Sequence, residues 1–173
     1  MNPKNIKQFV PGEFCIKCKS CCRFKDEISV WSPCLLEEEI QELLDKKGIP
    51  SASITIDRRL HPKANPKGSD FICPFLAVED NKCVIYEIRP FECQLYPFLI
   101  NLRRGKVLLT VDLNCPYVYE KIDTAEAKEY IAYLTKYLNS PKILKMLKEN
   151  PQIIQAYEEV REIAEINLPH EAE

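Results

Sequence analysis

The spacing of apolar residues predicts that the chain is helical from about residue 121 to residue 173. Asp123 and Glu126 have the pattern of a capping box, in which an acidic side chain in the first turn bonds back to the helix start. The apolar residues that follow at helical intervals are Ala127, Ile131, Leu134 and Leu138. We interpret this stripe as a surface that faces the core; the alternative is a face that binds a partner.

Proline interrupts and restarts this helical pattern twice. Ser140 with Pro141 predicts one helix start, and Asn150 with Pro151 predicts another, because proline is favoured at the first helical position. The apolar face of the last predicted helix is formed by Ile153, Tyr157, Val160 and Ala164. The segment is therefore predicted to contain three helices.

Residues 32–48 predict one amphipathic helix in the front part of the chain. It begins at Ser32 and Pro33, which repeat the Ser-Pro helix start, and it ends at Gly48. The acidic run at residues 37–39 is predicted to be a solvated face of this helix.

Three further segments have the pattern of short strands: 52–59, 71–87 and 98–113. The second is predicted to form two strands around a turn at Asp80 and Asn81, and the third a hairpin with Gly105 at its turn. Residues 88–97 contain too much proline for a long element. These patterns predict an α+β fold, in which a small, loop-rich and Cys-rich domain of short strands and hairpins spans residues 1–120. The helical segment 121–173 is predicted to pack on it as part of a single compact unit.

Length and composition fit one globular domain. The chain has 173 residues, 46% of them hydrophobic, which is enough for a real core. The formal net charge of -2 disfavours a nucleic-acid partner, because such proteins normally carry a basic excess. No apolar run reaches the roughly 18 residues that a membrane-spanning helix needs. The first residues have no apolar core of a secretory signal, so we expect a cytoplasmic protein without a membrane partner.

Nine cysteines are many for a cytoplasmic chain. Cytosolic thiols are kept reduced, and an odd number cannot pair completely, so a disulfide framework is the poorer explanation. Inert buried thiols are a further alternative. All nine cysteines lie between residues 15 and 115, and metal binding is the explanation that we favour.

The spacing of the first cysteines supports a metal site. Cys15, Cys18 and Cys21 have the C-x-x-C-x-x-C spacing with which bacterial ferredoxins wrap an iron–sulfur cluster, and each C-x-x-C pair is also typical of structural zinc sites. Cys22 directly follows Cys21, and the side chains of adjacent residues usually point apart. We therefore expect either that the two thiols bind at different metal sites or that one of them is not a ligand.

Later cysteines supply the remaining sulfurs for two four-thiolate sites. Cys73, Cys83 and Cys93 follow at equal intervals, and Cys115 is the last. Eight sulfurs would be needed and nine are present, and Cys34 is the one that we leave out. It lies just inside a predicted helix start among apolar residues, where a thiol behaves as a small buried hydrophobe.

Cations beside the cysteines could offset the negative charge of a thiolate site. Arg89 is the best candidate, because the rigid Pro90 follows it and Cys93 is near. Tyr86 and Arg89 could contact a substrate or cofactor, but we favour a role in ordering the Cys-containing loops. The other cations next to cysteines are Lys17, Lys19, Arg23 and Lys82.

The joint pattern resembles the CxxCxxCC family, also called the YkgJ family, whose domain is associated with chelation of zinc or iron. The resemblance rests on "CIKCKSCC", "CPFL", "CVIYEIRPFECQLYP" and the later Cys115, and it spans roughly residues 15–116. Many members carry Gly where this chain has Lys19. The resemblance implies eight metal ligands, which are Cys15, Cys18, Cys21, Cys22, Cys73, Cys83, Cys93 and Cys115.

Three functions stay open at this point. An iron–sulfur protein with a [4Fe–4S] cluster and a redox or accessory role is the preferred function, and some relatives of the family are named as iron–sulfur oxidoreductases. A structural module that holds Zn²⁺ for binding another protein is the first alternative, and a metal carrier or sensor is the second. No G-x-S-x-G, P-loop or G-x-G-x-x-G motif is present, so the sequence assigns no enzymatic reaction. It also assigns no specific protein partner and no oligomeric state.

Overall fold

The computed structural model describes residues 6–18, 20–47 and 49–168. The chain folds as two compact units, Met1–Gln94 and Leu95–Glu173. The boundary precedes the hairpin at residues 98–111, whereas the sequence places the end of the Cys-rich part after that hairpin, at residue 120.

In its described residues, the first unit combines short helices, the last of which ends at the boundary between the units, with strands of only two residues. Its strands form a sheet of order β1-β3-β2 and a separate hairpin of β4 and β5, all antiparallel. The helices are α1 (Gly12–Cys18), α2 (Glu37–Lys47) and α3 (Phe91–Leu95), with 3₁₀ turns η1 (Ser51–Ser53) and η2 (Tyr86–Ile88). The strands are β1 (Arg23–Phe24), β2 (Lys63–Ala64), β3 (Phe71–Ile72), β4 (Leu76–Ala77) and β5 (Lys82–Cys83).

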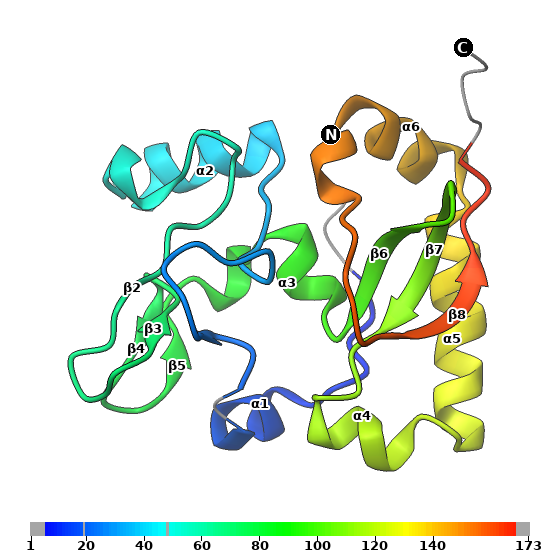
Figure 1. Cartoon of the computed structure of the whole chain (residues 1–173), viewed down its shortest axis with the longest axis horizontal. Coiled ribbons are helices and arrows are strands. Elements are labelled where there is room, and N and C mark those ends of the chain that lie inside the picture. Colours follow the sequence, from blue (N-terminus) through cyan, green and yellow to red (C-terminus); the bar gives the residue numbers. More distant parts are fainter. Residues whose placement is uncertain (1–5, 19, 48, 169–173) are drawn as a thin grey trace. The chain divides into compact units, whose positions relative to one another are not determined.

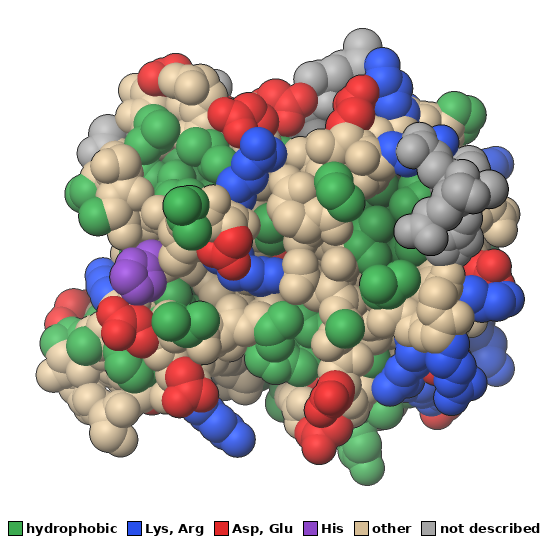
Figure 2. Space-filling model, turned by 45° about the horizontal axis from the view of Figure 1, so that its top comes forward, with side chains coloured by type: hydrophobic (Ala, Val, Ile, Leu, Met, Phe, Trp, Pro, Cys, Tyr) green, Lys and Arg blue, Asp and Glu red, His purple; other side chains and the backbone are tan. Residues whose placement is uncertain are grey.

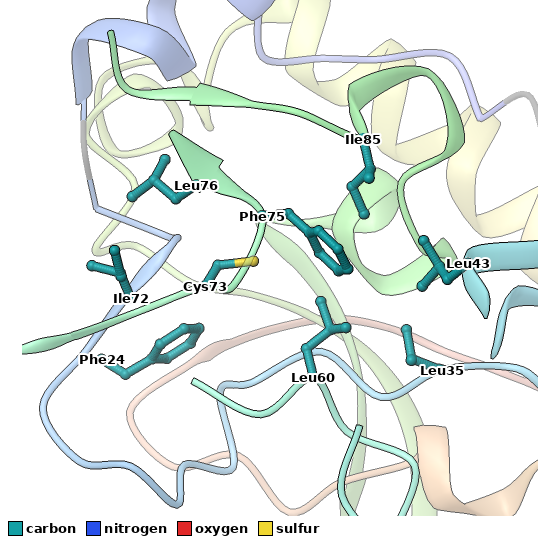
Figure 3. Close-up of a cluster of buried hydrophobic side chains, with 9 residues drawn as sticks. All are labelled: Phe24, Leu35, Leu43, Leu60, Ile72, Cys73, Phe75, Leu76 and Ile85. Carbon is teal, nitrogen blue, oxygen red and sulfur yellow. The ribbon is translucent and has the colours of Figure 1, made fainter. Parts of the chain in front are cut away.

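The core of the first unit includes a cysteine. Cys73 is 8% exposed and packs among buried aromatic and aliphatic side chains from five segments of the chain (Figure 3). Strands of two residues have too few ladder hydrogen bonds to be stable alone, so this cluster supplies much of their stability. The buried members are Phe24, Leu35, Leu43, Leu60, Ile72, Cys73, Phe75, Leu76 and Ile85.

The predicted start of α2 is wrong by four residues. The helix begins at Glu37 instead of Pro33, because the backbone before it is paired elsewhere. Leu35 N–H donates to Arg58 O at 2.8 Å, and Leu60 N–H donates to Pro33 O at 2.9 Å. These long-range bonds hold the segment before the helix extended. Gly48, the predicted end of the helix, lies outside the described residues.

Two other expectations for this region also fail. Glu39 was expected on a solvated face but is only 3% exposed. Residues 52–59 were expected to form a strand, yet the 3₁₀ turn η1 overlaps their start, and Ile54 and Arg59 form only isolated bridges, with Leu60 and Cys34. Arg58 has a φ of 62°, which breaks the extended backbone that a strand requires.

The second unit is built on the predicted hairpin. β6 (Phe98–Arg103) pairs with β7 (Lys106–Val111), and both Arg104 (φ 53°) and Gly105 (φ 73°) have the positive φ of a tight hairpin turn. β8 (Arg161–Glu165) joins the other edge of β7, and α5 (Ala125–Leu138) runs alongside this sheet (Figure 1). The remaining elements are α4 (Pro116–Lys121), α5 (Ala125–Leu138), α6 (Pro141–Glu149) and η3 (Pro151–Ile153).

The last predicted helix is wrong, since η3 and the strand β8 replace it. Asn101 on β6 is fully buried; its amide donates to Tyr157 O at 3.0 Å and accepts from Tyr157 N–H at 3.1 Å. These bonds hold the chain extended as it approaches β7, where Val111 pairs with Arg161. Tyr157 and Val160 are buried, but in an extended segment. Pairing along the sheet edge therefore overrides the helical spacing.

The other helices of this unit follow the sequence closely. Ala127, Leu134 and Leu138 of α5 are buried, and Ser140 and Pro141 begin α6 as predicted. The cap of α5 differs: Thr124 Oγ1 accepts the N–H of Ala127 at 3.2 Å, while Asp123 pairs with Arg161. Mixed helices and small antiparallel sheets confirm the α+β class.

Acidic and basic side chains are both spread over the face shown in Figure 2. Among the helices of the described residues, none combines the length and apolar character required to cross a bilayer.

Asn101→Leu should lower the free energy of unfolding by about 2–4 kcal/mol, because it removes both hydrogen bonds to Tyr157 from a fully buried position. Chemical denaturation followed by circular dichroism measures this. The matched control is Leu102→Ala on the next residue, which is 45% exposed and should cost less than about 0.5 kcal/mol. Equal losses in the two variants would show that Asn101 does not fasten the C-terminal segment.

Candidate metal centre

Backbone hydrogen bonds bring three of the predicted ligands into neighbouring positions. Cys73 follows β3, and its N–H donates to Cys22 O at 2.9 Å. Leu76 N–H donates to Cys73 O at 3.0 Å and closes a turn, and Leu76 pairs with Cys83 across the β4–β5 hairpin. Three cysteines that are far apart in sequence therefore lie on adjacent backbone segments.

The thiols of Cys73 and Cys83 each accept a backbone N–H from the residue two positions later. Burial raises the pKa of Cys73 to about 12, and the hydrogen bond from Phe75 N–H opposes that rise. Burial also raises the pKa of Cys83, and the N–H of Ile85 opposes it in the same way. Such N–H groups stabilise the thiolate form, which is the form that binds a metal.

The thiols of Cys93 and Cys21 interact electrostatically with those of Cys73 and Cys83. Burial raises the pKa of Cys93 well above its usual value, and the nearby thiols of Cys73, Cys83 and Cys21 raise it further. A hydrogen bond with the thiol of Cys22 is the main cause of the raised pKa of Cys21. We call Cys21, Cys73, Cys83 and Cys93 the thiol cluster. The thiols of Cys21 and Cys22 lie side by side, contrary to the expectation that they point apart.

The chemistry of this donor set fits a thiolate-bound metal. Within the described part of the chain, no three His, Cys, Asp or Glu side chains have metal-coordinating geometry. The four thiols of the cluster nevertheless lie within electrostatic range of one another, and the pKa of each is raised, which favours bound protons over free thiolates. A cation would displace those protons and relieve the mutual repulsion of the thiolates.

Cys15 and Cys18 lie on α1, where a loop was expected. Their spacing of three residues places them on one side of the helix. The side-chain amide of Asn81 donates to Ile16 O at 2.7 Å, which attaches α1 to the turn before Cys83. The Cys18 thiol donates to Ser20 Oγ at 3.4 Å. Lys19, the position at which many family members carry Gly, lies outside the described residues.

The two other cysteines are both buried. Cys34 is 1% exposed, as expected of a small buried hydrophobe, and burial and then the charge of Glu92 raise its pKa to about 12. Cys115 belongs to the second unit, where it is 6% exposed and is the residue that precedes α4. Its role as a ligand stays a prediction.

Arg89 lies close enough to the thiol cluster to act on it. Its charge lowers the pKa of both Cys21 and Cys83 against the larger effects that raise them. The guanidinium carbon is 4.1 Å from the centroid of the Tyr86 ring, and Nη2 donates to Gln8 Oε1 at 2.6 Å. Tyr86 therefore contributes to orienting Arg89. A Cβ atom at Gly12 would come within 2.9 Å of Tyr86 Oη, so the start of α1 fits closely against this ring.

Sequence reasoning missed a second cation. Lys63 on β2 donates to Pro74 O at 3.1 Å, and its charge lowers the pKa of the neighbouring Cys73. Lys63 is ten positions from Cys73 in the sequence, and only the pairing of β2 with β3 brings them together. No local pattern could have identified it.

Comparison with known proteins identifies a family that this chain matches and a relative to which part of it is similar. The family model "CxxCxxCC: Putative zinc- or iron-chelating domain" matches residues 14–132. This range extends into α5, beyond the expected end near residue 116. A stretch of 41 residues is 44% identical to the uncharacterized protein MJ0661 of Methanocaldococcus jannaschii, and it covers 24% of this chain and 22% of that relative. No solved structure matches.

Arg89→Gln should speed the release of bound metal to a chelator by roughly tenfold, because the thiolates lose a nearby positive charge. The release rate can be followed with a chromogenic chelator. Lys82→Gln is the matched control: Lys82 also neighbours Cys83, but it is exposed and paired with Asp80, and it should change the rate by less than about twofold. Equal rates for the two variants would contradict the role of Arg89.

Proposed function

Because the chain belongs to the CxxCxxCC family of zinc- or iron-chelating domains, we propose that its thiol cluster holds an iron–sulfur cluster of the [4Fe–4S] type. The single observation that carries this proposal is that the thiols of Cys21, Cys73, Cys83 and Cys93 lie close enough together for Coulomb interactions among them to change their pKa values. They come from four separate segments of the chain. Four thiols are the donor set of such a cluster.

The residues around the thiol cluster support a site of high negative charge. Four thiolates with a [4Fe–4S] core leave an excess of negative charge, and Arg89 and Lys63 face the cysteines with positive charge. The N–H groups of Phe75 and Ile85 provide further stabilisation at the sulfurs. Hydrogen bonds to sulfur and the local charge are two of the factors that set the reduction potential of an iron–sulfur cluster.

The proposed role is electron transfer or an accessory redox step in the cytoplasm. A bound [4Fe–4S] cluster supplies one-electron redox chemistry. The protein's own residues hold the thiolates, offset their charge and shield Cys73 in an apolar core. Such a role requires a protein redox partner. Cys15, Cys18 and Cys22 remain the other candidate ligands of the first unit.

Structural zinc is the second candidate, and the turns at Cys73 and Cys83 favour it. Each of these thiols accepts an N–H from the residue two positions later within a tight turn or hairpin. This arrangement also suits the closed four-thiolate sites in which zinc stabilises small, loop-rich folds. The chain would then act as a module that binds another protein.

Elemental analysis separates the two candidates. The protein is purified without oxygen and without a metal-affinity step, and its iron, zinc and acid-labile sulfide are measured. Iron and sulfide in equal amounts, about four of each per chain, support the proposal. Zinc at about one or two per chain without sulfide overturns it in favour of the structural module. The absence of both metals from the purified protein overturns both candidates.

Cys73→Ser should lose most of the bound metal, whereas Cys34→Ser should retain it. Both residues are buried thiols of the first unit, so they form a matched pair for the effect of inserting a hydroxyl into the core. Only Cys73 belongs to the thiol cluster. Metal content per chain is the measurement, and an equal loss from both variants would contradict the separation of Cys34 from the ligands.

A further inference from the structure

A buried carboxylate connects the starts of two helices in the first unit. Glu39, in the first turn of α2, is 3% exposed. Its Oε2 accepts the N–H of Leu36 at 2.9 Å, and its Oε1 accepts the N–H of Phe91 at 2.6 Å. The first bond caps α2, and the second caps α3. One side chain thereby fixes both helix starts.

A second carboxylate crosses between the same segments in the opposite direction. Glu92 on α3 accepts the N–H of Cys34 at 2.5 Å through its Oε2. Cys34 and Phe91 are each 1% exposed, and Leu36 is fully buried. Water therefore has little access to replace these bonds, and losing a buried acceptor of this kind is expensive.

The helix that is held in this way carries Cys93. α3 has only five residues, Phe91–Leu95, which is too short to be stable through its own hydrogen bonds. Cys93 lies two positions after Phe91 and directly after Glu92. Its distance from Cys73 and Cys83 is therefore set by how α3 is anchored.

We infer that Glu39 is a positioning residue, which holds the thiol of Cys93 in the thiol cluster by fixing the start of α3. This inference rests on the proposed function, in which the thiol cluster binds a metal. It assigns a role to an acidic residue that neither binds the metal nor adjoins a cysteine in the sequence. Mutation of residues that orient metal ligands commonly lowers the affinity for the metal by tenfold or more.

The test measures how fast each cysteine is alkylated in the metal-loaded protein as purified. N-ethylmaleimide is added, and mass spectrometry of peptides gives a separate rate for each thiol. In Glu39→Ala we expect the early rate at Cys93 to rise about tenfold, while the rate at Cys73 changes less than about twofold. Glu39→Gln keeps one oxygen acceptor and should give an intermediate rise.

Glu37→Ala is the matched control. Glu37 lies on the same turn of α2, but its side chain is 66% exposed and pairs with Arg58 at the surface. Its alkylation pattern should equal that of the unaltered protein. If Glu39→Ala does not fold, Glu39→Gln carries the same test.

Two results would overturn the inference. The first is an unchanged rate at Cys93 in both Glu39 variants. The second is an equal rise at Cys93 and Cys73, which would indicate general loosening. Alkylation of the unaltered protein after treatment with a chelator tests the proposed function separately. If chelation raises the alkylation rate of none of the four thiols and elemental analysis finds no metal, the proposed function fails, and the inference fails with it.

Discussion

Burial of the apolar core around Cys73 is the constraint on which the first unit depends. Its strands have two residues each, and its short helices contribute few bonds of their own. The apolar core around Cys73 therefore has to hold the segments together, and it does so with cysteines in and beside it. A metal bound by these thiols would add covalent-like cross-links between segments that are far apart in sequence, and its binding energy would contribute directly to folding.

The basic and the acidic side chains around the thiol cluster act in different ways. Arg89 and Lys63 act on the sulfurs, where their positive charge favours the thiolate form. Glu39 and Glu92 accept backbone N–H groups at the start of α3 and act on the position of Cys93. Acidic and basic side chains thus contribute to the same site through different groups: the cations through charge, and the acids through hydrogen bonds to the backbone.

The parts of the fold that depend on local patterns could be predicted from the sequence. The turn at Gly105 and the start of α6 at Pro141 are examples, because glycine and proline restrict the backbone within a few residues. β8 could not be predicted, because its pairing with β7 spans some fifty residues and overrides a helical pattern. The prediction of where α2 starts was wrong for the same reason, since residues 33–35 pair with residues 58–60.

The candidate site, too, has features that the local sequence predicts and features that depend on long-range contacts. Cysteine spacing identified all four members of the thiol cluster as possible ligands, and Arg89 as their neighbour. The sequence could not show that Cys21 joins Cys73, Cys83 and Cys93, because their proximity depends on β1 pairing with β3 and on the anchoring of α3. Lys63 and Glu39 were missed because only the tertiary fold brings Lys63 near Cys73 and Glu39 to the start of α3.

X-ray absorption spectroscopy at the metal edge, on protein purified without oxygen, tests the central claim most directly. Thiolate ligation predicts a first shell of sulfur alone, about four atoms per metal at about 2.3 Å. A first shell dominated by nitrogen or oxygen would contradict the claim that the thiol cluster is the metal site.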